Sequence, residues 1–103
     1  MNKLDIILKL IIGLGYRYTI LGSKIHCIKY TDIIEVPNSI LNIKYNIVLR
    51  IVDIMNYDYG INVGKNPIIL FNNIRYDIDD FINILNLDYR YIKIHKLKKL
   101  IDG

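Results

Sequence analysis

The sequence predicts an α+β fold, in which small antiparallel sheets and one or two short helices surround a single core and a basic C-terminal extension follows. The chain has 103 residues, the size of one small domain. Hydrophobic residues make up 52% of it, with Ile and Tyr prominent, and β-branched and aromatic side chains favour strands. Cations crowd into the last fourteen residues. We therefore expect one α+β domain over residues 1–88 and a basic tail over residues 89–103.

The clearest local signal is a β-hairpin near the N-terminus. Two β-rich runs, 16–21 and 24–30, flank a Gly-Ser pair at Gly22, a two-residue turn typical of hairpins. Apolar and polar residues alternate along both runs, which predicts one apolar and one polar face. Gly13 and Gly15 come just before, but without a third glycine and a following helix they do not indicate a phosphate-binding loop. We expect tight backbone packing or a bulge there.

The middle of the chain predicts further strands and a short helix. Residues 33–36 have extended character that ends at Pro37, because proline cannot donate to a β-ladder. Residues 40–52 alternate apolar and polar side chains, which predicts a strand pair or one long bent strand. Asp53 is a suitable cap for a short helix over residues 54–63.

The last third of the chain returns to strand and then to helix. Residues 68–76 have strand character around Asn72 and Asn73, which can turn the chain because Asn tolerates positive φ. Residues 77–86 have the apolar spacing of a capped helix. Residues 89–103 have the character of a strand followed by a helix, and one interpretation is that this tail orders only on a partner.

Few residues are suited to catalysis or metal binding. Asp77, Asp79 and Asp80 lie at the start of the predicted helix, where carboxylates complement the helix dipole, and this explains them better than a metal site does. Cys27 is the only cysteine, which excludes an internal disulfide and favours a reducing compartment. We expect it to pack as a small apolar residue. The two histidines complete neither a zinc site nor a nucleophilic triad, so we expect no enzyme activity, cofactor or metal.

No targeting or membrane segment is predicted. The sequence has no run of eighteen uninterrupted apolar residues, so we expect no membrane span. The apolar stretch 4–14 is reminiscent of a signal-peptide core, but Asp5 and Lys9 interrupt it and no small-residue cleavage site follows. We therefore assign this stretch to the folded domain.

The composition carries information about origin. Ala, Gln and Trp are absent, Glu35 is the only glutamate, and Ile, Asn, Lys, Tyr and Asp are in excess. The favoured residues have AT-rich codons, whereas Ala has GC-rich ones, which indicates an AT-rich coding genome. An organelle, a parasite or a virus fits this bias.

The charge distribution favours a polyanionic partner such as RNA. The net charge is +4 with a pI near 9.2, and a solvated face is the alternative explanation for the basic tail. Arg binds phosphate bidentately and Tyr can stack on bases, although Tyr16 and Tyr76 also suit a core. Arg17 and Arg75 are the better candidates, because an Arg on the polar side of a strand has little structural purpose. The predicted RNA-binding residues are Arg17, Lys24, Lys29, Lys65, Asn72, Asn73, Arg75, Arg90, Lys93, Lys96, Lys98 and Lys99.

Four short motifs occur in the same order as in a known family. They are Leu-Ile-Ile-Gly-Leu-Gly-Tyr-Arg at 10–17, Ile-Glu-Val-Pro-Asn-Ser-Ile at 34–40, Ile-Val-Asp at 51–53 and Asn-Ile-Arg-Tyr at 73–76. This order resembles the C-terminal domain of the large-subunit ribosomal protein L-six family, over about residues 8–80. The sequence departs from the family at residues 31–33, where the family has Ser-His-Pro, and at residues 70–73, where the family has lysines.

The resemblance implies a structural constituent of the large ribosomal subunit. It implies binding to large-subunit ribosomal RNA near the sarcin-ricin and translation-factor region, with neighbouring ribosomal proteins as partners. The first domain of the family is missing, which implies either a reduced protein or a separate chain that supplies it. Together with the AT-rich composition, the resemblance implies an organelle-encoded protein of the mitochondrial ribosome.

A second hypothesis comes from a different class of protein. The excess of Ile and Tyr also fits a small viral or plasmid protein-interaction module that binds a partner chain through an exposed apolar surface. The two hypotheses differ in the salt dependence of binding, because neutralising phosphates releases counterions and apolar contact does not.

Overall fold

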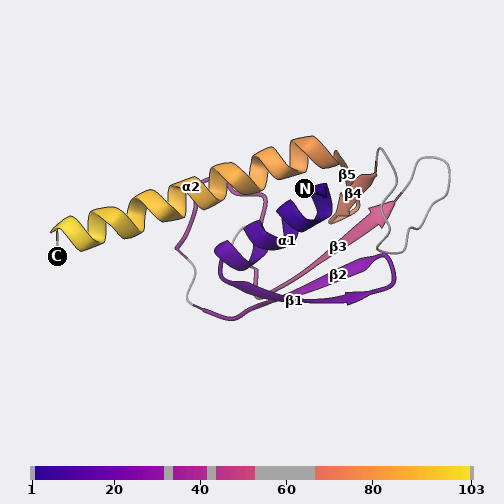
Figure 1. Cartoon of the computed structure of the whole chain (residues 1–103), viewed down its shortest axis with the longest axis horizontal. Helices are drawn as coiled ribbons and strands as arrows, with labels where there is room; N and C mark the ends of the chain where they lie inside the picture. Colours follow the sequence, from indigo (N-terminus) through magenta and orange to yellow (C-terminus); the bar gives the residue numbers. More distant parts are fainter. Residues whose placement is uncertain (1, 32–33, 42–43, 53–66, 103) are drawn as a thin grey trace.

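The computed structural model describes residues 2–31, 34–41, 44–52 and 67–102, and shows an antiparallel sheet with two helices on one face (Figure 1). The order along the chain is α1 (Lys3–Gly13), β1 (Tyr16–Leu21), β2 (Lys24–Lys29), β3 (Asn46–Val52), β4 (Ile68–Phe71), β5 (Ile74–Asp77) and α2 (Ile78–Asp102). The predicted α+β class is confirmed. The described strands form one five-stranded sheet instead of several small ones.

The sheet is a meander, in which neighbours along the chain are also neighbours in the sheet, in the order β1-β2-β3-β4-β5. The predicted hairpin is confirmed: Leu21 pairs with Lys24, which leaves a two-residue turn in which Gly22 has a φ of 60°. The turn between β4 and β5 is also confirmed, with φ of 53° at Asn72 and 64° at Asn73. Two successive positive φ values define the type I′ turn, whose twist matches that of the flanking strands.

Helix α1 was not predicted as a helix, although its residues were correctly assigned to the folded domain. The Asn2 side chain accepts a hydrogen bond from the Leu4 backbone N–H at 3.0 Å and so caps the first turn. Leu4, Ile7 and Ile11 recur at the spacing of one helix face, and all three are buried. The helix therefore forms because a capped first turn and an apolar stripe outweigh the strand preference of Ile.

The glycines at the C-terminal end of α1 allow the close packing predicted for them. A Cβ added at Gly13 would lie 2.4 Å from a ring carbon of Tyr89, so only glycine lets α2 approach this closely. Gly15 has a φ of 100°, a conformation that side chains disfavour. Its carbonyl accepts hydrogen bonds from the backbone N–H groups of Tyr30 and Thr31, which ties the start of β1 to the end of β2.

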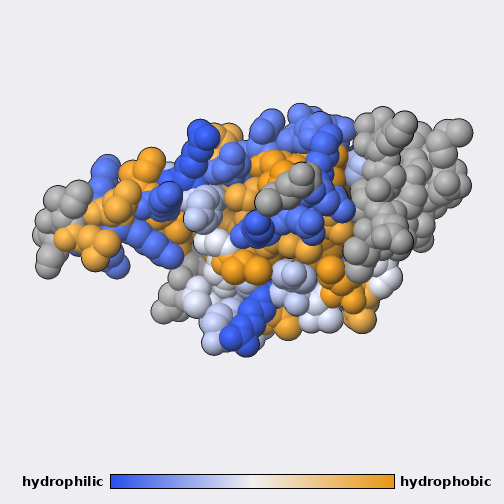
Figure 2. All heavy atoms as spheres, in the orientation of Figure 1, coloured by the Kyte–Doolittle hydropathy of each residue, from blue (hydrophilic) through white to orange (hydrophobic). Residues whose placement is uncertain are grey.

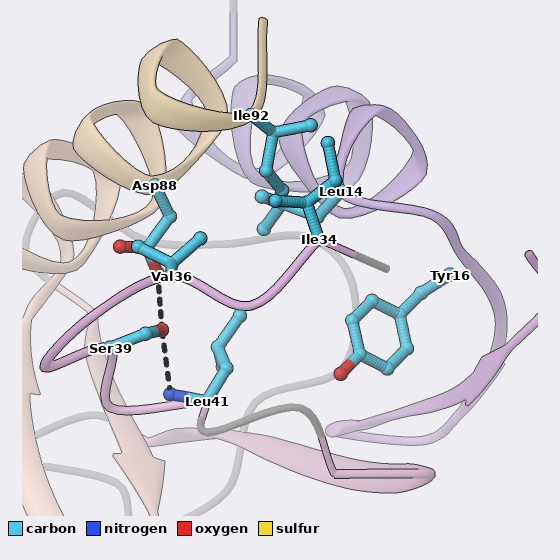
Figure 3. A pocket seen from close by; sticks show the side chains of 8 residues that line it. All are labelled: Leu14, Tyr16, Ile34, Val36, Ser39, Leu41, Asp88 and Ile92. Atoms are coloured by element: carbon cyan, nitrogen blue, oxygen red, sulfur yellow. Dashed lines mark hydrogen bonds between the residues drawn. The ribbon is translucent and has the colours of Figure 1, made fainter. Parts of the chain in front are cut away.

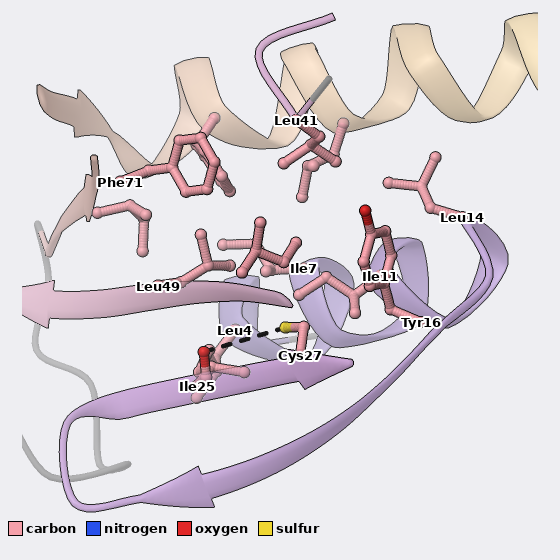
Figure 4. Close-up of a cluster of buried hydrophobic side chains, with 14 of the residues drawn as sticks. Leu4, Ile7, Ile11, Leu14, Tyr16, Ile25, Cys27, Leu41, Leu49 and Phe71 are labelled. Carbon is pink, nitrogen blue, oxygen red and sulfur yellow. Dashed lines mark hydrogen bonds between the residues drawn. The ribbon is translucent and has the colours of Figure 1, made fainter. Parts of the chain in front are cut away.

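The core lies between the helices and one face of the sheet. Figure 4 shows Ile25 and Cys27 of β2 beside α1, with Leu49 of β3 and Phe71 of β4 directed toward α2. The prediction that Cys27 packs as an apolar residue is confirmed, since its side chain is 1% exposed. Burial raises the pKa of its thiol to about 12, so Cys27 is an unreactive core residue.

Helix α2 is much longer than the predicted helix. Asp77 caps it by accepting a hydrogen bond from the Asp79 backbone N–H at 3.2 Å, in agreement with the capping role predicted for these acids. It then runs through 25 residues, so the segment expected to be strand and then helix is helical as far as Asp102. The predicted boundary at residue 88 falls inside this helix. Ile92, in the predicted tail, belongs to the core with 4% exposure.

The end of α2 projects from the body of the protein. Residues 93–100 are exposed, apart from the half-buried His95. The molecule measures 51 × 24 × 21 Å, and the C-terminal turns of α2 account for its elongated shape (Figure 1). In the described part of the chain, neither helix has the length and apolar character needed to cross a membrane.

The segment before β3 differs from the prediction. β3 begins at Asn46, and neither residues 34–36 nor residues 40–41 form a strand. Residues 34–41 instead pack against α2, where Ser39 donates a hydrogen bond to Asp88 at 2.6 Å. The helix predicted for residues 54–63 lies outside the described residues.

Candidate nucleic-acid interface

The sheet face that points away from both helices carries most of the cations of the strands. Side chains alternate along each strand, and those opposite the core form what we name the outer face. Its members are Arg17, Thr19, Leu21, Lys24, His26, Ile28, Asn46, Val48, Arg50, Val52, Ile68, Leu70, Arg75 and Asp77. Within the described residues no helix or strand covers this face. It therefore presents cations and apolar side chains together, with Asp77 as its one acid.

Strand pairing aligns five outer-face residues in a row that crosses the whole sheet. Leu21 pairs with Lys24, Lys24 with Arg50, Arg50 with Leu70, and Leu70 with Arg75. Lys24 and Arg50 are direct cross-strand neighbours, and like charges in that position repel. Lys24 and Arg75 have no ion-pair partner among the described residues. Lys24 and Arg75 are therefore the two cations of the row that are suited to a polyanion.

A hollow of about 360 Å³ adjoins this row and brings further predicted residues to it. Lys24 and Arg50 line it on one side, and Asn72 and Asn73 of the β4–β5 turn line it on the other. Leu70 contributes an apolar wall. The amide groups of the turn can donate to or accept from a base edge, while the cations are suited to phosphate. The structure thus places Lys24, Asn72, Asn73 and Arg75 at the same end of the sheet.

A second concave site lies at the edge strand β1. Arg17 and Lys96 both line it, together with Tyr18, Tyr30 and the glycines at the end of α1, and its volume is about 550 Å³. The Arg17 guanidinium carbon lies 3.4 Å from the centre of the Tyr30 ring, a cation–π stack. The long α2 is what brings Lys96 to Arg17, about eighty residues earlier in the chain.

The other predicted cations of the tail lie around the projecting end of α2. They are Arg90, Lys93, Lys98 and Lys99, and all four are exposed. Leu87, Ile94, Leu97 and Leu100 are exposed among them, Leu100 by 80%. Figure 2 shows hydrophobic residues interspersed with hydrophilic ones along this end of the helix. The end of α2 is therefore basic and apolar at once.

Two of the predicted cations do not join these groups. Lys29 pairs with Tyr16 at the end of β2, on the core-facing side of the sheet. Lys65 lies outside the described residues. The structure therefore gives Lys29 a position apart from the outer face.

Two tyrosines considered for base stacking pack in the core or against it. Tyr16 is buried, and its hydroxyl donates to the Lys44 carbonyl at 2.7 Å. Burial, with a smaller effect from Cys27, raises the pKa of Tyr16. The Tyr76 ring packs 5.4 Å from that of Phe81. Tyr30 is the exposed tyrosine that contacts a predicted cation, and it was not among the predicted residues.

A small cavity beside Asp88 is structural. Its volume is about 20 Å³, which is room for one water molecule. Figure 3 shows Asp88 pointing from α2 toward Ser39, whose hydroxyl also accepts a hydrogen bond from the Leu41 backbone N–H at 3.2 Å. Burial raises the pKa of the Asp88 carboxyl, while the hydrogen bond from Ser39 lowers it by less. The pair fastens residues 34–41 to α2.

Replacing Asp88 with Asn is expected to change the pH dependence of stability. Because the folded-state pKa of Asp88 lies above its unfolded value of about 3.8, the favourable contribution of the neutral acid is present below pH 3.8. That contribution is lost as the pH rises through the folded-state pKa. The free energy of unfolding of Asp88→Asn, relative to the native protein, should therefore be higher at pH 7 than at pH 4. Urea denaturation of both proteins at the two pH values measures this difference in the free energy of unfolding.

The control for this measurement is Glu35→Gln, which removes an exposed carboxyl from the same segment. A relative stability of Asp88→Asn that is equal at the two pH values, or lower at pH 7, would contradict the buried placement of Asp88. Both proteins lose one negative charge, so the comparison separates the effect of burial from that of net charge.

Comparisons with known proteins identify no similar protein. No protein-family model, curated protein or solved structure gives a significant match to this chain. Among the described residues no group of three or more His, Cys, Asp or Glu side chains is placed to hold a metal ion.

Sequence reasoning did not identify Arg50 as a site residue. The sequence did contain a signal for Arg50, since the alternation in residues 40–52 places Arg50 on the polar side of the strand. What the alternation does not show is which residues lie beside it on the neighbouring strands. Lys24 and Leu70 become its neighbours only through the register of the sheet.

Proposed function

We propose that this chain binds RNA, with the outer face of the sheet as the docking surface. The observation that carries this proposal is the row that places Lys24 and Arg75 across the strands on one face, which no described helix covers. The row crosses four inter-strand steps of about 4.8 Å each, or about 19 Å. That length matches several nucleotides of an extended strand, and the apolar neighbours Leu21 and Leu70 offer surfaces for bases.

We propose further that the RNA belongs to the large ribosomal subunit of a mitochondrion, near the sarcin-ricin and translation-factor region. The support is the resemblance to the L-six family and the AT-rich composition. Arg17 and Arg75 come from two separate motifs of that resemblance, and both have outer-face positions although they lie on the opposite edge strands β1 and β5. Neighbouring ribosomal proteins are the further partners that this proposal implies. The proposed role is binding without a chemical reaction.

A protein-interaction module remains the second candidate function. The observation that favours it is the exposure of Leu87, Ile94, Leu97 and Leu100 on α2. Such side chains suit contact with another chain, whereas the outer-face row suits a polyanion. The RNA proposal accounts for the aligned cations, which an apolar contact leaves unexplained.

Binding to single-stranded RNA should be measurable and should weaken strongly with salt. We expect the logarithm of the association constant to fall with the logarithm of salt concentration with a slope of about −2 to −3, as for three to four neutralised phosphates. Fluorescence anisotropy with a labelled 12-nucleotide RNA between 50 and 200 mM KCl measures this slope. An absence of binding at 50 mM KCl, or an affinity that does not change with salt, would exclude the proposed function.

A further inference from the structure

We infer that the pocket between β1 and the overhanging end of α2 is a binding site for one unpaired nucleotide. We name it the edge pocket; Arg17, Tyr18, Tyr30 and Lys96 line it. This inference rests on the proposed function and goes beyond it, because it assigns a particular unit of the ligand to a particular place. The outer-face row itself lines a different hollow, at the Lys24 end of the sheet.

Size is the first argument. The edge pocket has a volume of about 550 Å³, which lies in the range of sites for small organic ligands. A nucleoside monophosphate is a ligand of that size. The cavity beside Asp88, at about 20 Å³, has no room for one.

The chemistry of the lining is the second argument. Arg17 and Lys96 supply two positive charges from two different elements, β1 and α2, which is suited to a phosphate held by both. Tyr30 and Tyr18 supply aromatic surface on which a base can stack. Phosphate and base thus each have a partner of the right kind within one pocket.

The Arg17–Tyr30 stack is the third argument. At 3.4 Å from the ring centre, the guanidinium lies over one face of Tyr30 before any ligand is present. The orientation of the Arg17 side chain is therefore fixed before a ligand binds, so less side-chain entropy is lost on binding. A base that enters can extend this stack, since bases stack on guanidinium planes as well as on aromatic rings.

The position of α1 indicates which way the nucleotide points. Gly13 and Gly15 line the pocket at the C-terminal end of α1, where the helix dipole is negative. A phosphate is unfavourable there, whereas the amino group of a base is favourable. The phosphate should therefore lie toward Arg17 and Lys96, with the base directed toward the end of α1.

Titration with single nucleotides tests the inference directly. AMP and UMP, each compared with its nucleoside, are added to the full chain labelled with ¹⁵N, and backbone amide shifts are followed. We expect saturable shifts at residues 12–18, 30–31 and 96 with the monophosphates, and affinity at least about fivefold weaker with the nucleosides. Lys96→Gln should weaken AMP binding about tenfold, because it removes a charged donor. Tyr30→Leu should weaken it at least about fivefold through lost stacking.

Two controls match these variants. Lys9→Gln removes an exposed lysine of α1, and Tyr45→Leu removes an exposed tyrosine; neither residue lines the edge pocket. Both should bind AMP as the native chain does. Equal affinity of the native, Lys96→Gln and Tyr30→Leu chains would overturn the inference, as would shifts confined to Lys24, Arg50 and Arg75.

A competition experiment identifies the source of the nucleotide. If a 12-nucleotide RNA displaces AMP from the edge pocket, the occupant is a nucleotide of the bound strand. If it does not, the pocket takes a free nucleotide, and the assignment of the pocket to a unit of the RNA is overturned. Failure of the edge pocket is distinguishable from failure of the proposed function. If only the edge-pocket inference fails, Lys24 and Arg75 variants still lose RNA affinity. If only the proposed function fails, AMP still binds at Arg17 and Lys96.

Discussion

Replacing Lys24 and Arg75 together with Gln is expected to lower the affinity for single-stranded RNA about ten- to hundredfold at 100 mM salt. Each replacement removes a charged donor from the outer-face row, and hydrogen bonds to charged groups are among the strongest in proteins. The salt slope should also become less steep by about 1.4, since two fewer phosphates are neutralised at about 0.7 each. Anisotropy titrations at several salt concentrations give both values.

The matched control is the double variant Lys3→Gln and Lys9→Gln. It removes the same net charge from exposed positions on α1, which covers the opposite face of the sheet. Lys3 forms an ion pair with Asp79 at 3.0 Å, and exposed pairs of this kind add about 0–1 kcal/mol to stability. The control should keep an RNA affinity within about threefold of the native chain. An equal loss in the two double variants would mean that net charge, and not the outer-face row, determines binding.

The hairpins were predictable because their information is local. Gly22 and the pair Asn72 and Asn73 adopt the positive φ values that two-residue turns need, and the neighbouring residues alternate as strands do. The sequence therefore indicated where β1, β2, β4 and β5 lie. Strand assignments failed at residues 40–41 and 44–45, since alternation alone does not show whether a partner strand is available.

The helices were harder to predict because Ile and Tyr favour strands. In α1, the cap at Asn2 and the spacing of Leu4, Ile7 and Ile11 were readable signals that the strand propensity of the same residues obscured. In α2, the segment after residue 88 has the composition of a strand, but Ile92 continues the buried side of the preceding turns. Tertiary packing thus overrides local preference there.

In the candidate site, too, some features follow from the local sequence and others depend on tertiary packing. Alternation within a strand is local, so the polar-side positions of Arg17 and Arg75 followed from the sequence. The alignment of Lys24 with Arg50 depends on the register between strands, and the approach of Lys96 to Arg17 depends on how α2 packs on α1. That packing in turn needs Gly13, whose missing side chain makes room for the Tyr89 ring. The individual cations were therefore predictable, whereas their grouping into a row and a pocket was not.

Replacing Phe81 with Ala is expected to destabilise the fold by about 3–5 kcal/mol. The Phe81 side chain is fully buried where α2 packs on the sheet, with its ring centre 6.4 Å from that of Phe71 and 5.4 Å from that of Tyr76. Its removal leaves a cavity at the point that fixes the direction of α2. Urea denaturation should show the loss, and the melting temperature should fall by more than about 10 °C.

Leu87→Ala is the control on the same helix, because Leu87 is 65% exposed and its truncation should change stability by no more than about 0.5 kcal/mol. A similar small effect for Phe81→Ala would mean that α2 does not pack on the sheet as described. Lys96 would then have no fixed position beside Arg17, and the edge pocket would lose one of its walls. The stability of Phe81→Ala therefore tests the packing on which that site depends, independently of any ligand.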